Sequence, residues 1–194
     1  MQPITNQEKI FFWLRVYLGT TNIQELKLAA VDRAYRDFNR TMHGFREERT
    51  PEAYNILRNL MLIIAEETFT TIFDQASFDV WHKSKCDQLI AEFYNLLKYQ
   101  ISYGQAQKWI NMTLKYMFAI GNEIINGIDK NYMFFHIPVD NIIQDKLEFY
   151  DISKIKGKWS RIDNYEIYFQ YQKLVREAFI GQIPLEVEFR LFNE

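Results

Sequence analysis

The chain has 194 residues, a length that suits one domain, and its 48% hydrophobic and 16% aromatic residues are ample for a core, so a disordered chain is not expected. Lysine and arginine total 23 against 25 aspartates and glutamates. The resulting net charge of −2 excludes a global attraction to nucleic acid, so a polyanion would need a local basic face.

Apolar runs are short throughout the sequence. Pieces such as residues 60–65 fall far below the roughly 20 residues that a membrane-spanning helix needs, and the N-terminus lacks a basic segment followed by an apolar one. A single cysteine, Cys86, cannot form an internal disulfide, so the expected location is cytoplasmic. We expect no membrane partner, and a monomer is favoured although no pattern fixes the oligomeric state.

Apolar residues at helical spacing, punctuated by capping residues, glycine and proline, predict four helices in the first half of the chain. The first runs from residue 5 or 6 to 18, and the second runs from 22 to Gly44. A Thr-Pro pair at 50–51 begins the third, which continues toward residue 73, because threonine caps a helix and proline suits its first position. The fourth runs from Ser77 to about residue 99.

The second half is predicted to continue in the same way. A short hairpin, YGQAQ, precedes a helix at 106–120 that Gly121 closes, and further helix starts occur at Pro138 and near Arg161. The C-terminal LEVEFRLF alternates like a strand, but a lone strand has no partner for its backbone groups, so a short helix or an extended tail is favoured. We therefore predict a single all-α domain over residues 1–194, a compact bundle of about seven or eight helices.

Familiar catalytic and metal-binding motifs do not occur in the sequence. None of the three histidines, His43, His82 and His136, has a second histidine, a cysteine or a carboxylate at a metal-ligand spacing. The phosphate-binding patterns GxxxxGK[ST] and GxGxxG and the nucleophile pattern GxSxG are also missing. No metal and no cofactor are expected.

Two segments, YGQAQKWINMTLKYMFAIG at 103–121 and FHIPVDNII at 135–143, carry a family resemblance. The segments contain, in this order, a helix, a glycine-containing hairpin and a second helix with a lysine near its start. An apolar-Pro-apolar-Asp stretch that opens another helix then follows. The order resembles the helix-hairpin-helix DNA glycosylases. Gly104, Ala106 and Lys108 stand at the Gly-x-Gly-x-Lys positions of that family's hairpin, and Asp140 stands at its catalytic aspartate. The 32-residue spacing is similar to the archaeal oxoguanine-glycosylase branch.

The resemblance implies excision of a damaged or modified base from double-stranded DNA, with possible AP-lyase activity. Lys108 would present a neutral amine that attacks the sugar C1′, and Asp140 would stabilise positive charge on the sugar or take the proton from the amine. Free amides at the hairpin would hold a DNA phosphate. The residues of this backbone contact are Gly104, Gln105, Ala106 and Gln107.

A flipped base also needs a pocket with stacking side chains, and the duplex needs a basic platform. The candidates for base binding are Trp109, Tyr132, Phe134, Phe135 and His136. The candidates for the platform, all in the stretch SKIKGKWSR at 153–161, are Lys154, Lys156, Lys158 and Arg161.

Each of these features has a plainer explanation. Aromatic residues of an all-α protein mostly fill the core, and short charge runs are common in solvated loops. Lys108 could cover a helix edge with its stem, and Asp140 could be a capping acid. The alternative function is accordingly a non-enzymatic α-helical protein-interaction or regulatory module.

Overall fold

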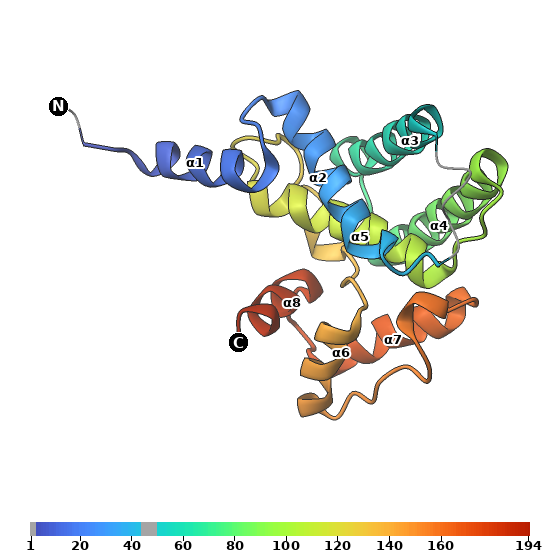
Figure 1. The fold of residues 1–194 in the computed structure, drawn as a ribbon. Helices are drawn as coiled ribbons and strands as arrows, with labels where there is room; N and C mark the ends of the chain where they lie inside the picture. The colour runs from blue at the N-terminus through green and yellow to red at the C-terminus, as the bar shows by residue number, and fades with distance from the viewer. Residues whose placement is uncertain (1–2, 44–49) are drawn as a thin grey trace.

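The computed structural model describes residues 3–43 and 50–194 of the chain. Within these residues the fold is all-α, as predicted, with eight α-helices, three short 3-10 helices and no strand (Figure 1). The α-helices are α1 (Asn6–Leu18), α2 (Ile23–Asn39), α3 (Pro51–Thr70), α4 (Gln75–Leu97), α5 (Tyr103–Ile120), α6 (Asn141–Leu147), α7 (Tyr165–Ala178) and α8 (Pro184–Asn193). The 3-10 helices are η1 (Tyr132–Phe134), η2 (Glu148–Tyr150) and η3 (Trp159–Arg161).

Capping residues begin the early helices where the sequence predicts. The Thr5 side chain accepts a hydrogen bond from the Glu8 amide at the start of α1, and Thr50 accepts one from the Ala53 amide at the start of α3. The second helix ends at Asn39, earlier than predicted, because the chain turns there and the Thr41 hydroxyl donates to the Phe38 carbonyl. Its predicted end at Gly44 lies outside the described residues.

Helix α5 lies at the centre of the fold. It contacts α2, α3, α4, α7 and η3, and fourteen of its eighteen residues are buried. Figure 1 shows α2, α3 and α4 packed around it, with α6, α7 and α8 gathered together below in this view. A helix buried on nearly all sides is apolar on most of its surface, so the polar residues that α5 carries inside need partners from other elements.

The turn between α4 and α5 lies upstream of the predicted YGQAQ hairpin. Lys98 adopts a left-handed conformation with φ 49° and ends α4, and Ser102 caps α5 through a reciprocal capping box with Gln105. The turn therefore occupies residues 98–102, and the residues predicted to form the hairpin make the first turn of α5.

The C-terminal stretch LEVEFRLF forms α8, the first of the two conformations that the sequence left open, a short helix or an extended tail. Pro184 occupies its first turn, and Leu185, Glu188 and Leu191 are buried at helical spacing. The helix packs against α6 and η1, which places its acidic and aromatic residues beside α5.

A helix that crosses a lipid bilayer needs roughly 20 mostly apolar residues. None of the described helices combines the length and the apolar content that crossing a membrane requires.

Candidate functional site

Lys108 and Asp140, 32 residues apart in sequence, meet in the structure. Lys108 projects from the second turn of α5, and its Nζ lies 2.5 Å from Oδ2 of Asp140. The Lys108 side chain is 4% exposed and that of Asp140 is 21% exposed, so the pair opens to solvent on the aspartate side. The fold therefore assembles the two groups that the sequence motifs singled out.

The two carboxylate oxygens of Asp140 bind different partners, a backbone amide of α6 and the Lys108 amine. Asp140 is the N-cap of α6, and its Oδ1 accepts a hydrogen bond of 2.9 Å from the Ile143 amide. The capping role proposed as a plainer explanation is thus real, and it also explains why α6 begins at Asn141 and not at Pro138. Oδ2 remains available to Lys108.

A second, more deeply buried ion pair lies beside the first. Lys115 follows Lys108 by two helical turns on the same face of α5, and its Nζ lies 2.6 Å from both carboxylate oxygens of Glu188 on α8. The side chains are 8% and 4% exposed. Burial raises the pKa of the Glu188 carboxyl, and the adjacent Lys115 ammonium opposes that rise.

Both ion pairs line one pocket of about 460 Å³. The pocket walls come from five helices, because α1, α2, α5, α6 and α8 all contribute side chains. Besides the two pairs, the charged lining residues are Arg33, Asp37 and Arg40, and the aromatic ones are Tyr17, Tyr116, Phe189 and Phe192. The pocket thus combines stacking surfaces with charges of both signs.

Sequence reasoning missed Lys115, Glu188, Phe189 and Phe192. The seven-residue spacing from Lys108 would have placed Lys115 on the Lys108 face of α5, but the matching acid lies 73 residues away. The rings of Phe189 and Phe192 have centroids 4.9 and 4.5 Å from the Lys115 Nζ, so both aromatic residues are held against a cation.

Three of the aromatic residues predicted to bind a base are in the core. Trp109, Phe135 and His136 are each 1% exposed or less, and the Trp109 Nε1 donates to the Val31 carbonyl at 3.1 Å. None of the three lines the pocket beside Lys108. Their positions agree with the plainer explanation that aromatic residues fill the core.

The other two predicted base-binding residues are half-buried at η1. The Tyr132 ring stacks on Phe118 with centroids 4.7 Å apart, and its hydroxyl lies 3.1 Å from a Glu186 oxygen. Phe134 packs against the core beside it. Neither residue lines the pocket, so the structure separates this group from the Lys108 side chain.

The backbone amides predicted to hold a phosphate are engaged within the protein. The Gly104 amide donates to the Ile162 carbonyl at 3.1 Å, and the Gln105 and Ala106 amides donate to the Ser102 side chain and carbonyl. Gln107 lies inside the helix and is fully buried. The expected free amides at 104–107 are therefore not found at this helix start.

The predicted basic platform packs directly on the start of α5. The Ser102 hydroxyl donates to the Ser160 carbonyl at 2.8 Å, and the Trp159 ring centroid lies 6.0 Å from the Lys108 Nζ. Lys154 forms ion pairs with Asp145 and Glu148. The remaining three cations of the stretch, Lys156, Lys158 and Arg161, are exposed and have no ion pair among the residues that the structure describes.

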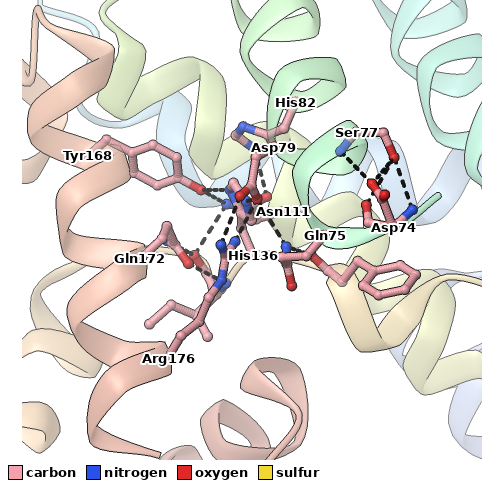
Figure 2. Close-up of polar contacts among 12 residues, drawn as sticks. Asp74, Gln75, Ser77, Asp79, His82, Asn111, His136, Tyr168, Gln172 and Arg176 are labelled. Atoms are coloured by element: carbon pink, nitrogen blue, oxygen red, sulfur yellow. Dashed lines mark hydrogen bonds and ion pairs between the residues drawn. The ribbon is translucent and has the colours of Figure 1, made fainter. Parts of the chain in front are cut away.

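A buried polar network lies behind the site, between α4, α5 and α7 (Figure 2). Asp79 accepts hydrogen bonds from His136 and from both terminal nitrogens of Arg176. Burial alone would raise the pKa of Asp79, but the hydrogen bonds from His136 and Arg176 hold it below its ordinary value. Burial lowers the pKa of both His82 and His136, so these imidazoles are neutral at pH 7.

The same network brings together a cysteine, a histidine and an asparagine. Cys86 Sγ lies 3.8 Å from His82 Nδ1, and His82 Nε2 lies 3.0 Å from Asn111 Oδ1. All three residues are at most 1% exposed, and burial raises the pKa of the thiol. A nucleophile needs a thiolate within reach of substrate, so this set is structural.

A larger pocket of about 760 Å³ lies between α4 and the start of α7, away from the two ion pairs. Its most buried carboxylate is Asp79, and the hydrogen bonds described above already occupy both of that carboxylate's oxygens. The smaller pocket is therefore the better candidate site, because two largely buried ion pairs line it.

Comparisons with protein-family models, with curated proteins and with solved structures give no match for this chain. Within the described residues, no group of three or more histidine, cysteine, aspartate or glutamate side chains is arranged to hold a metal ion. The candidate site is accordingly defined by its geometry and by the chemistry of its side chains.

Proposed function

We propose that the protein is a DNA glycosylase with associated AP-lyase activity, in which Lys108 is the amine nucleophile and Asp140 is the catalytic carboxylate. The observation that carries the proposal is the 2.5 Å contact between Lys108 Nζ and Asp140 Oδ2 at the wall of a pocket. An amine nucleophile requires a base within hydrogen-bond distance to take its proton, and Asp140 meets that requirement.

The reaction follows from this arrangement. A proton passes from the Lys108 Nζ to Asp140 Oδ2, the freed amine forms a bond to C1′, and the glycosidic bond breaks so that its electrons leave with the base. The base takes up the proton from Asp140. The C1′–O4′ bond then breaks and a proton passes from Nζ to O4′, which opens the sugar ring and leaves a protonated imine between Nζ and C1′, the intermediate that a lyase needs.

The pocket supports the proposal by its size and its lining. Small-molecule sites usually measure about 300–1,000 Å³, and this pocket, at about 460 Å³, falls in that range. A base flipped out of a duplex is read by stacking and by hydrogen bonds to its edge. Phe189 and Phe192 offer rings, and Glu188 and Lys115 offer polar atoms, within the same pocket.

The exposed cations support a duplex platform near the start of α5. Lys156, Lys158 and Arg161 precede or belong to η3, which packs against the start of α5 and against the Lys108 side chain through Trp159. Phosphate contacts from lysine and arginine provide most of the non-specific affinity for DNA. A local face of this kind compensates for the net negative charge of the chain.

The proposal is tested by measuring base release from duplexes that each carry one modified base. We expect the wild-type protein to release at least one such base and Asp140→Asn to slow that release about 100-fold or more, since general acid–base groups contribute factors of that size. Asp129→Asn, a substitution of an exposed aspartate outside the pocket, is the matched control. Unchanged release by Asp140→Asn would remove the aspartate from the mechanism, and no release from any duplex would overturn the proposed function.

A second candidate function, protein interaction, rests on α1. No residue of this helix is buried, and Phe12, Trp13 and Val16 are 60%, 66% and 61% exposed. Exposed apolar clusters of this kind mark interaction surfaces. Binding to duplex DNA whose affinity falls with salt would favour the glycosylase, whereas a stable protein partner and no DNA affinity would favour this alternative.

A further inference from the structure

Residues 135–139, here called the strap, connect η1 to Asp140 as a buried extended segment. Phe135, His136, Ile137 and Val139 are each 1% exposed or less. Buried backbone groups need hydrogen-bond partners, and an extended segment normally finds them in a neighbouring strand. Since the described residues contain no strand, the strap must be held by other groups.

Gln172 on α7 serves as one such partner. Its side-chain Oε1 accepts a hydrogen bond of 3.1 Å from the Ile137 amide, and its Nε2 donates to the Ile137 carbonyl at 2.9 Å. A side-chain amide carries a donor and an acceptor side by side, like a peptide group, so it can pair with both backbone groups of one residue. Gln172 thus takes the place of a neighbouring strand at Ile137.

Gln107 on α5 holds Val139 in the same way. Its Oε1 accepts from the Val139 amide at 3.2 Å, and its Nε2 donates to the Val139 carbonyl at 2.9 Å. The Gln107 side chain is itself fixed, because Asn111 Nδ2 donates to its Oε1 at 3.0 Å. Pro138, between the two paired residues, has no backbone N–H that would need a partner.

The start of the strap is anchored through a side chain. The His136 Nε2 lies 2.7 Å from an Asp79 oxygen, its Nδ1 lies 2.9 Å from the Tyr168 hydroxyl, and Arg176 holds Asp79 with two hydrogen bonds (Figure 2). Figure 2 shows Gln172, Asn111 and His136 converging on this region from α7, α5 and the strap. The strap is therefore fixed along its length by side chains of α4, α5 and α7.

We propose that Gln107 and Gln172 are positioning residues, which hold the strap so that the Asp140 carboxylate stays at the Lys108 amine. Gln107 directly precedes Lys108, and Val139 directly precedes Asp140, so the Gln107–Val139 pair sets the register one residue away from both members of the ion pair. The catalytic consequence rests on the proposed function, while the positioning of the ion pair does not.

The positioning is tested without any activity measurement by double-mutant cycles. Urea unfolding gives the stabilities of Lys108→Met, of Asp140→Asn and of the double variant. The set is measured in the wild-type background and again in the Gln107→Met background, and each set gives the free energy of coupling between Lys108 and Asp140 in that background. Asn131→Leu is the matched control background. The buried Asn131 amide also makes three hydrogen bonds to backbone groups, but at residues 68–73, away from the ion pair.

We expect Gln107→Met to remove at least half of the coupling and Asn131→Leu to leave it intact. Equal coupling in the three backgrounds would overturn the inference. Should Gln107→Met fail to fold, Gln107→Asn is the milder variant, because it keeps an uncharged amide but is one methylene too short to pair with both backbone groups of Val139. We expect it to reduce the coupling in the same direction, and full coupling in this variant would overturn the inference as well.

The catalytic consequence is tested by the single-turnover rate of base release at saturating DNA. Gln107→Met is expected to lower the rate at least tenfold and to change the DNA dissociation constant less than twofold, since small displacements of reacting groups lower rates strongly. A fall in rate equal to that of Asn131→Leu would contradict the positioning role. If the wild-type protein releases no base, the proposed function fails, and the coupling measurement still decides the inference.

Discussion

Gly104 lacks a side chain because another part of the backbone occupies the space where a Cβ would lie. A Cβ built on Gly104 would be 1.8 Å from the Trp159 carbonyl oxygen, far inside any permitted contact. The motif led us to expect a glycine that gives a phosphate access to free amides. The structure shows a glycine that lets η3 pack against α5, beside the amine of Lys108.

The close approach predicts the effect of Gly104→Ala. In an open helix this change stabilises by about 1 kcal/mol, because alanine has the higher helix propensity. At this position we expect destabilisation by about 2 kcal/mol or more, since backbone must move to admit the methyl group. Urea unfolding measures the difference, and a stabilising substitution would show that η3 does not pack here as described.

The buried histidines predict a pH dependence of stability. Because burial lowers the pKa of His82 and His136, the unfolded chain binds protons below about pH 6.5 that the folded chain does not. The free energy of unfolding should therefore fall as the pH is lowered from about 7.5 to 5.5.

His82→Gln should make this fall smaller, since it removes one of the two groups. The measurement is urea unfolding of each variant at both pH values. His43→Gln, at an exposed position, is the matched control. If the free energy of unfolding of His82→Gln falls between the two pH values as much as that of the wild-type protein, His82 is not the group that causes the pH dependence.

At the scale of elements, local chemistry predicts the starts of the first three helices correctly. Thr5, Asn22 and Thr50 are all capping residues that accept hydrogen bonds from the amides that follow them. The glycine pattern at 103–107 predicts that α5 starts at residue 106, but the Ser102–Gln105 capping box begins the helix at Tyr103. The capping pattern was present in the sequence and would have corrected the prediction.

The exposed face of α1 leads to a further prediction. Phe12 and Trp13 are mostly exposed, so replacing both with serine should change the free energy of unfolding by no more than about 0.5 kcal/mol per substitution. Leu14 on the same helix packs against the core. Leu14→Ser is therefore the control, and it should lower the free energy of unfolding clearly more. Equal losses in the two variants would mean that Phe12 and Trp13 are buried in solution by another molecule or by a second copy.

At the scale of the whole molecule, the candidate site could be predicted only in part. The pairing of Lys108 with Asp140 followed from the order of two short motifs. The Lys115–Glu188 pair and the aromatic residues of α8 depend on how α8 packs beside α5, and no local pattern specifies a contact across 73 residues. Three of the five predicted base-binding aromatics, Trp109, Phe135 and His136, are buried because a core of this size needs large side chains near α5.

Borohydride trapping on duplex DNA with an abasic site tests the central claim most directly. Reduction converts an imine between the protein and the sugar into a stable covalent bond, and mass spectrometry locates the modified lysine. We predict a trapped adduct at Lys108 in the wild-type protein, none in Lys108→Ala, and an unchanged adduct in Lys146→Ala, whose lysine lies outside the pocket. No adduct, or the same yield from wild-type protein and Lys108→Ala, would contradict the assignment of Lys108 as the nucleophile.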